Sequence, residues 1–395
     1  MFILLCAALK IFAQQNVDSL LIEWRFKTGS PIIASPVIQN DLVLFGSTDS
    51  IFYALNASAG TVKFTFKTGG DIRSTCVVLN DRIWLNGGDG NLYCLNLQGE
   101  LVWTFKTNGE KKYPLYSFAD YFQSSPVYDT GDIFFGSGDS CIYAVNASTR
   151  KMKWKFKTDD IVHSTAAVSG NNIFIGSFDG YFYSLNRNTG KLNWKFKSIG
   201  QQYFPKGEFN GSATVIGNTV YVGSRDYNFY ALDTAKGFAK WNLRFPRGWA
   251  ITTPVTDSSV LYIGTSDDRS FIAADLAGNI FWRFDAKYNM FGAPIVHDNT
   301  IFFGTMMGNL FGLNKKTGTV QYKFMTDASR LNRKNYFKED ESYRDDIFKN
   351  IIKKNEDFLQ LYIETGGIIS QPAISRNRIF VTSMDGTLYC LKLKD

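Results

Sequence analysis

The sequence is poor in the residues that usually build metal and redox sites. Histidine occurs only at His163 and His297 among 395 residues, so a histidine-based metal site would be sparse. Five cysteines are present, but none are neighbours and none form a C-x-x-C pattern. Cys94 and Cys390 occupy a repeat position that holds alanine or serine elsewhere, which favours small buried residues without redox chemistry.

The apolar run at the start, MFILLCAALKIFAQ, is too short to span a bilayer. It resembles the hydrophobic region of a secretory signal peptide, although it lacks a positive segment in front and carries Lys10, so translation could begin further upstream. Cys6 raises the alternative of a lipoprotein, but Leu5 is larger than the residue that such sites want before the cysteine. We predict a signal peptide over residues 1–13, no transmembrane span, and export to the periplasm or the outer membrane.

The net charge of +7 comes partly from a recurring Phe-Lys-Thr motif, which begins at residues 26, 66, 105 and 156. Lysines spread evenly around a repeat array are typical of solvated strand positions. A nucleic-acid interface should instead gather positive charge on one face. The charge pattern therefore predicts no nucleic-acid partner.

A repeat organises the chain, and residues 171–197 show its pattern best. Short apolar runs over 173–176 and 181–185 are joined at Asp179-Gly180, and a turn at residues 188–190 leads to an aromatic run around Trp194. With the preceding run over 164–168, these segments predict an antiparallel meander of four strands. One such sheet cannot bury both faces alone, so copies must stack on one another.

Constant spacing shows that the pattern occurs eight times. A small residue that opens each copy is followed ten residues later by a glycine-like position, as in Pro36 and Gly46. The eighth copy ends without a fourth strand, whereas the chain begins with an unpaired one, Glu23 to Gly29. Pairing of these two ends would close a ring and leave no free edge. We predict one all-β domain over residues 14–395, an eight-bladed β-propeller of four-stranded blades.

Three links between blades are longer than the rest, and all three fall on the face that also carries the Asp-containing turns. They add residues 108–122, residues 201–207 and a charged insertion of about forty residues, 327–367. Apolar residues at helical spacing after Asp345-Asp346 predict one amphipathic helix in the insertion. This helix could simply pack on the propeller, or it could act as a lid or a partner-docking helix.

The same face carries an asymmetric ring of residues three positions before each opening residue. In blade order these are Ile33, Arg73, Gln123, His163, Asn210, Ile251, Phe291 and Ile369. Blades two to five are polar here and the others are apolar, with aromatic residues nearby. Such a channel mouth is typical of a small-ligand or peptide site, although ordinary rim packing would explain it too. Our candidate binding residues are Arg73, Tyr121, Gln123, His163, Asn210, Trp249 and Phe291.

The runs YAVNAST (143–149) and YSLNRNTGKLNW (183–194) resemble the tryptophan-docking repeats of the pyrroloquinoline-quinone (PQQ)-type propellers. The resemblance covers nearly the whole chain outside the signal and the insertion. That superfamily includes quinoprotein alcohol dehydrogenases and the non-catalytic outer-membrane assembly lipoprotein BamB, both eight-bladed. The motif is specific for the fold and poor for function.

The resemblance implies two functions that residue chemistry can separate. A quinoprotein dehydrogenase should hold Ca²⁺ with carboxylate and amide oxygens, use an Asp base and carry an adjacent Cys-Cys pair. This chain has no Cys-Cys pair, and its recurring aspartates read as turn residues because every copy repeats them. Glu110, Asp120, Glu208 and Asn210 could supply ligands, but no spacing selects them.

We therefore expect a non-catalytic binding or scaffolding propeller of the bacterial envelope, similar to BamB-like proteins, with a protein partner and no cofactor. A PQQ-dependent dehydrogenase of alcohols or sugars, which would need PQQ and Ca²⁺, is the first alternative. A carbohydrate- or peptide-sensing module is the second.

Overall fold

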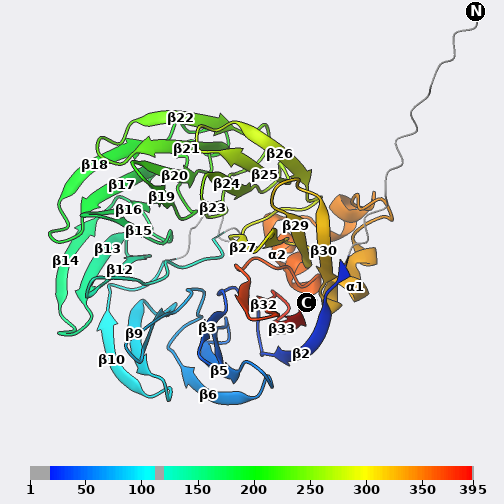
Figure 1. Cartoon of the computed structure of the whole chain (residues 1–395), viewed down its shortest axis with the longest axis horizontal. Coiled ribbons are helices and arrows are strands. Elements are labelled where there is room, and N and C mark those ends of the chain that lie inside the picture. The colour runs from blue at the N-terminus through cyan, green and yellow to red at the C-terminus, as the bar shows by residue number, and fades with distance from the viewer. Residues whose placement is uncertain (1–17, 112–119, 394–395) are drawn as a thin grey trace, which may run out of the picture.

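The computed structural model describes residues 18–111 and 120–393, which form a ring of eight β-sheets (Figure 1). The expected signal segment, residues 1–13 with Cys6, lies outside the described residues. Each sheet contains an antiparallel four-stranded meander, and one sheet carries a short fifth strand. The predicted eight-bladed propeller is confirmed.

Blades 1 to 4 follow one another along the chain, each running from an inner to an outer strand. Blade 1 consists of β3 (Val37–Gln39), β4 (Leu42–Gly46), β5 (Ile51–Asn56) and β6 (Val62–Lys67). Blade 2 consists of β7 (Val77–Leu79), β8 (Arg82–Asn86), β9 (Asn91–Asn96) and β10 (Leu101–Lys106). Blade 3 consists of β11 (Val127–Asp129), β12 (Asp132–Ser137), β13 (Cys141–Asn146) and β14 (Met152–Lys157). Blade 4 consists of β15 (Ala167–Ser169), β16 (Asn172–Gly176), β17 (Tyr181–Asn186) and β18 (Leu192–Lys197).

Blades 5 to 7 continue the same order. Blade 5 consists of β19 (Thr214–Ile216), β20 (Thr219–Gly223), β21 (Asn228–Asp233) and β22 (Ala239–Arg244). Blade 6 consists of β23 (Val255–Asp257), β24 (Val260–Gly264), β25 (Ser270–Asp275) and β26 (Ile280–Asp285). Blade 7 consists of β27 (Ile295–His297), β28 (Thr300–Gly304), β29 (Asn309–Asn314) and β30 (Val320–Met325).

Blade 8 closes the ring with strands from both ends of the chain. Its inner strands are β31 (Ala373–Ser375), β32 (Arg378–Thr382) and β33 (Thr387–Lys392), and its outer strand is β2 (Leu21–Lys27). Trp24 lies opposite Cys390 and Arg25 lies opposite Tyr389, as the predicted closure requires. A feature that the sequence did not predict is β1 (Asp18–Ser19), which pairs in parallel with the outer strand of blade 7.

The recurring aspartates join neighbouring blades, which confirms their reading as turn residues. In blade 4 one carboxylate oxygen of Asp179 accepts the backbone N–H of Tyr181 at 2.8 Å. The other accepts the Tyr183 hydroxyl at 2.6 Å and the N–H of Asp159, which follows blade 3, at 3.1 Å. Asp49, Asp89, Asp139 and Asp226 make the same set of bonds. A carboxylate held this way fixes a turn and needs no catalytic explanation.

The outer-strand tryptophans form a second kind of link between blades. The indole N–H of Trp194 donates to the carbonyl oxygen of Thr234 in blade 5 at 2.9 Å. The ring lies over Gly237, whose φ is +75°, and a Cβ atom there would lie 2.4 Å from Trp194. Glycine is therefore required by both the backbone conformation and the close approach. Trp24, Trp154, Trp241 and Trp282 dock in the same way on the next blade.

The hydrophobic core is divided into clusters that lie between adjacent blades. One cluster joins Phe134 and Ile142 of blade 3 to Ile173 and Tyr183 of blade 4. Cys94 and Cys390 are buried in such clusters, as expected for small core residues. Each blade therefore depends on both neighbours, which explains why closure of the ring matters for stability.

The insertion differs from the single amphipathic helix that the sequence predicted. It contains α1 (Asp327–Asn332), the 3₁₀-helix η2 (Arg333–Asn335), the π-helix η3 (Ile347–Ile351) and α2 (Asn355–Glu364). Asp346 stands at the N-cap position of η3, but its side chain pairs with Arg344 and makes no capping hydrogen bond. Asp357 instead accepts the backbone N–H groups of residues 353 and 354 and fixes the start of α2. The apolar residues near helical spacing therefore belong to two separate helices.

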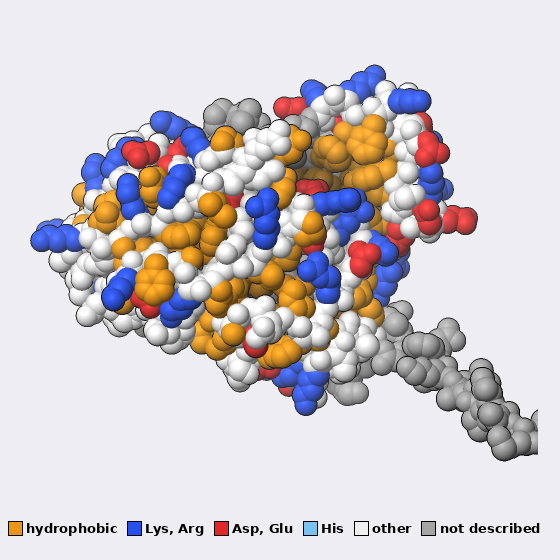
Figure 2. Space-filling model, turned by 90° about the horizontal axis from the view of Figure 1, so that it is seen from above, with side chains coloured by type: hydrophobic (Ala, Val, Ile, Leu, Met, Phe, Trp, Pro, Cys, Tyr) orange, Lys and Arg blue, Asp and Glu red, His pale blue; other side chains and the backbone are white. Residues whose placement is uncertain are grey.

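The lysines of the outer strands lie at solvent-exposed positions, as the repeat predicts. The lysines of the Phe-Lys-Thr motifs are all exposed at the ends of outer strands. Figure 2 shows lysine and arginine side chains spread over one side of the molecule among hydrophobic ones, without gathering in a groove. In the described part of the chain, no helix has the length and apolar character needed to cross a membrane.

Candidate functional site

A hydrophobic cluster on one face unites all three long links with the channel mouth. We call it the cap cluster, and its members are Ile33, Tyr121, Phe204, Trp249, Ile251, Tyr288, Phe291, Met306, Met307, Tyr336, Phe337, Ile347, Ile352, Leu361, Tyr362, Ile369 and Met384. Tyr121 and Phe204 come from the two shorter links, and residues 336–362 come from the insertion. The prediction that the elaborations share one face is confirmed, and the main apolar stripe of the insertion packs on the propeller.

Three of the predicted site residues form an aromatic chain within the cap cluster. The ring of Phe291 meets Tyr121 edge-on at a centroid distance of 5.4 Å and Trp249 at 6.3 Å. Trp249 in turn meets Phe204 at 4.9 Å. All of these rings are buried, so they stabilise the cap through edge-to-face contacts and burial.

Beneath the cap, Arg73 and His163 hold the link between blades 2 and 3. Nδ1 of His163 lies 2.7 Å from a carboxylate oxygen of Asp120, and its Nε2 contacts the carboxylate of Glu110. The Arg73 guanidinium donates to the carbonyl oxygens of residues 120 and 121 and pairs with Asp71 at 3.0 Å. Both described ends of this link, at residues 110 and 120, are therefore fixed to blade 4 by one buried imidazole.

Electrostatics indicates that the imidazole is positively charged at neutral pH. Burial alone would lower the pKa of His163, but Asp120 and Glu110 together outweigh burial and raise this pKa to about 9. Burial likewise opposes the charged form of Asp120, yet His163, Arg73 and Arg225 hold the pKa of this carboxyl below its usual value. The pair is thus a buried ion pair with hydrogen bonds on both ring nitrogens.

A cavity of about 560 Å³ lies within the ring at this level. Its walls include four of the predicted polar residues, Arg73, Gln123, His163 and Asn210, and the predicted aromatic Phe291. The other two predicted residues, Tyr121 and Trp249, do not line it and belong to the cap cluster. The structure therefore brings the half-polar ring together around one cavity, although the cap lies over what the sequence suggested was an open mouth.

Arg225 is a buried residue of this region that the sequence analysis did not select. Its guanidinium lies 4.6 Å from the Trp249 ring centroid and 5.0 Å from that of Phe178, in cation–π geometry. The position just before the turn aspartate in each copy could have revealed it. At this repeat position blade 4 has Phe178 and blade 5 has Arg225. Blade 8 has Met384, which is also buried under the cap.

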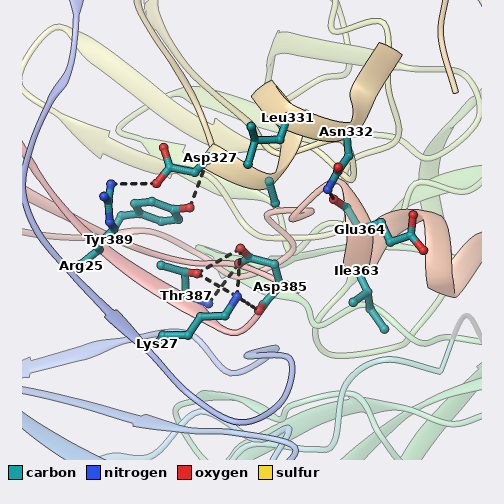
Figure 3. Close-up of a pocket in the computed structure, with 11 residues that line it drawn as sticks. Arg25, Lys27, Asp327, Leu331, Asn332, Ile363, Glu364, Asp385, Thr387 and Tyr389 are labelled. Atoms are coloured by element: carbon teal, nitrogen blue, oxygen red, sulfur yellow. Dashed lines mark hydrogen bonds and ion pairs between the residues drawn. The ribbon is translucent and has the colours of Figure 1, made fainter. Parts of the chain in front are cut away.

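A second hollow, the seam groove, lies where the insertion meets blade 8 and has a volume of about 460 Å³. One side carries the pairs Arg25–Asp327 at 2.8 Å and Lys27–Asp385 at 3.2 Å. Figure 3 shows that Leu331 on α1, near Asp327, and Ile363 on α2 also line the groove. Leu331 is 70% exposed, so the groove combines open apolar surface with charged side chains.

The described residues do not fit the calcium site that a quinoprotein dehydrogenase needs. Within residues 18–111 and 120–393, no group of three or more His, Cys, Asp or Glu side chains could hold a metal ion. Two of the candidate ligands, Asp120 and Glu110, are both engaged by His163. Cys76, Cys94, Cys141 and Cys390 are separate buried thiols.

Comparisons with known proteins agree with this architecture. The family profile described as "Outer membrane protein assembly factor BamB" matches residues 21–196, 88–243 and 185–335. BamB from Moraxella catarrhalis has a similar structure, with a TM-score of 0.70 at 14% identity over 95% of this chain and 100% of that chain. Quinohemoprotein alcohol dehydrogenase from Comamonas testosteroni gives 0.69 at 13% identity over 95% of this chain and 77% of that chain. The computationally designed protein Ika8 gives 0.68 at 11% identity over 93% and 98%. No curated protein sequence matches the chain.

Proposed function

We propose, from the premise that this chain belongs to the family of the outer membrane protein assembly factor BamB, that it is a non-catalytic scaffold of the bacterial envelope. It binds a protein partner through the face that carries the long links. The observation that carries this proposal is the gathering of all three long links, the insertion included, in one cap cluster. Elaboration of one face of a repeat ring is typical of a binding surface.

The seam groove and the insertion are the surface where we place the partner. Leu331 and Phe348 are 70% and 58% exposed, and Arg25, Asp327 and Lys27 border the groove. Exposed large apolar side chains within a charged rim are the usual anchors of a protein interface.

Capture of partners from envelope extracts tests this surface. The chain offers a matched pair of exposed phenylalanines for a test variant and its control. Phe348 in the insertion is 58% exposed, and Phe281 on the outer strand of blade 6 is 59% exposed. We expect Phe348→Ser to lower the amount of captured partner severalfold and Phe281→Ser to leave it unchanged. Equal capture by both variants and the wild type would contradict the location, and no partner in any extract would contradict the scaffold role.

The fold similarity to a quinohemoprotein alcohol dehydrogenase supports a second candidate, a PQQ-dependent dehydrogenase of alcohols or sugars. The poor fit of the described acidic residues to Ca²⁺ argues against it. Titration with PQQ and Ca²⁺, followed by absorbance and by dye reduction with alcohols and sugars, separates the two. We expect neither saturable binding nor reduction, and either result would favour the dehydrogenase.

Export to the periplasm or the outer membrane is part of the same proposal. Cell fractionation locates the protein, and mass spectrometry of the mature N-terminus distinguishes cleavage near residue 13 from lipidation of Cys6. We expect an envelope fraction, and recovery in the cytoplasm with an intact N-terminus would contradict the envelope role.

A further inference from the structure

A chain of hydroxyl groups lines the channel cavity. The residue just before each opening position is a serine or threonine in blades 1 to 6, and those of blades 1 to 5 form a hydrogen-bonded run: Ser35, Thr75, Ser125, Thr165 and Ser212. Each hydroxyl oxygen accepts the backbone N–H of the same position in the preceding blade, at 2.9 to 3.2 Å. The run begins at the N–H of Gln371 in blade 8 and ends at Ser212 in blade 5.

The protons of these hydroxyls remain available to the cavity. A serine or threonine hydroxyl has one donor besides its acceptor lone pairs. Within the described residues, none of the five donates to another protein atom, and all five are half-buried against the cavity. The channel therefore presents a curved row of hydrogen-bond donors, fixed in position by the backbone.

The opposite wall of the cavity carries the apolar side chains, together with the polar Thr253 and Gln371. Ile251, Phe291 and Ile369 line it at the level of the polar residues of blades 2 to 5. The charge nearby is balanced, because Arg73, His163 and Arg225 stand against Asp71, Asp120 and Glu110. The site thus offers oxygen-binding donors on one side, an aromatic ring on the other, and no excess charge for an ion.

We propose that this cavity binds a small neutral sugar or polyol, with ligand oxygens toward the hydroxyl row and the C–H face of the ligand toward Phe291. Its volume of about 560 Å³ lies within the usual range of small-molecule sites. The inference goes beyond the scaffold function, since it uses neither the seam groove nor a protein partner. Binding of the sugar and capture of the partner can therefore fail separately.

Saturation-transfer NMR on the full chain with glucose, N-acetylglucosamine and maltose tests the proposal. Thr165→Val removes one donor, and with it the acceptor of the Ser125 N–H, with almost no change of shape, whereas Thr165→Ser retains both. The matched control is Thr61→Val, because Thr61 is exposed in a turn outside the cavity. We expect millimolar binding of at least one sugar, a five- to tenfold loss in Thr165→Val, and wild-type affinity in the other two variants.

Several results would overturn the assignment. Absence of transfer from all three sugars at millimolar concentration would do so, as would binding that Thr165→Val leaves unchanged. Binding of glucuronate or sulfate without any neutral sugar would show an anion site instead. If Thr165→Val does not fold, Phe291→Leu tests the other wall, and unchanged sugar binding in that variant contradicts the proposed pose.

Discussion

The ion pairs around His163 predict a measurable loss of stability at alkaline pH. The pKa of this residue is about 9 in the folded protein and 6.5 as an ordinary value. Between these values the unfolded chain has lost a proton that the folded chain keeps, so the free energy of unfolding falls as the pH rises. The contribution is complete below pH 6.5, decreases by about 1.4 kcal/mol per pH unit, and totals about 3 kcal/mol when lost.

Urea unfolding of the wild type and of His163→Gln, from about pH 7 to about pH 9.5, measures this contribution. Lysines and tyrosines titrate in both proteins, so the difference between the two curves isolates the imidazole. His297→Gln is the matched control, since His297 is partly exposed on β27 and, among the residues that the structure describes, forms an ion pair with Asp298 alone, at 3.5 Å. We expect it to keep the wild-type slope.

Removal of the imidazole should also destabilise the protein at neutral pH. Glu110 and Asp120 would be left buried without their partner, which typically costs about 3 to 5 kcal/mol. Wild-type and His163→Gln curves that run parallel from pH 7 upward would refute the reasoning. They would mean that the folded protein already holds a neutral imidazole, and that the link between blades 2 and 3 is fixed by other contacts.

Three further predictions concern the links between blades and the thiols. Gly237→Ala should destabilise the protein by several kcal/mol, visible as a lower urea midpoint, because φ is +75° and the new Cβ would contact Trp194. Tyr183→Phe should cost about 1 kcal/mol by removing the bond to Asp179 and should leave partner capture unchanged. The buried cysteines should react with a thiol reagent only after unfolding, since burial raises the pKa of Cys390 to about 12; rapid reaction of Cys390 in the folded protein would contradict this.

The propeller could be predicted from the sequence because the repeat leaves few alternatives. A constant spacing of ten residues between two anchors in all eight copies fixes the strands and turns, and the unpaired segment around Trp24 fixes the closure. The turn role of Asp179 followed from its recurrence alone. The strand β1 was missed, because a parallel pair of two residues at an outer edge leaves no pattern in the sequence.

The insertion could not be predicted in detail because its helices are set by packing against the propeller surface. The spacing of its own apolar residues does not determine them. Ile347 and Ile352 are both buried under the cap, and they stand five residues apart, which a π-helical turn accommodates. Phe348 and Ile351, which a regular helix would place with them, are exposed instead. Tertiary contact with the channel mouth decides which of these residues is buried, and a single sequence holds no record of that contact.

The separation of symmetric and asymmetric contacts explains why the candidate sites lie at the channel. Aspartate turns and tryptophan docking recur around the ring. Contacts that are repeated from blade to blade maintain the fold and do not mark one blade as a functional site. At the mouth the repeat breaks, since the polar wall spans blades 2 to 5 and the buried Arg225 occurs in one blade alone. A buried charged imidazole is unfavourable unless its partners are fixed, and the long link between blades 2 and 3 supplies those partners for His163. The asymmetric residues therefore depend on the same elaborations that form the binding face, and loss of the insertion should disturb the channel cavity as well as the partner surface.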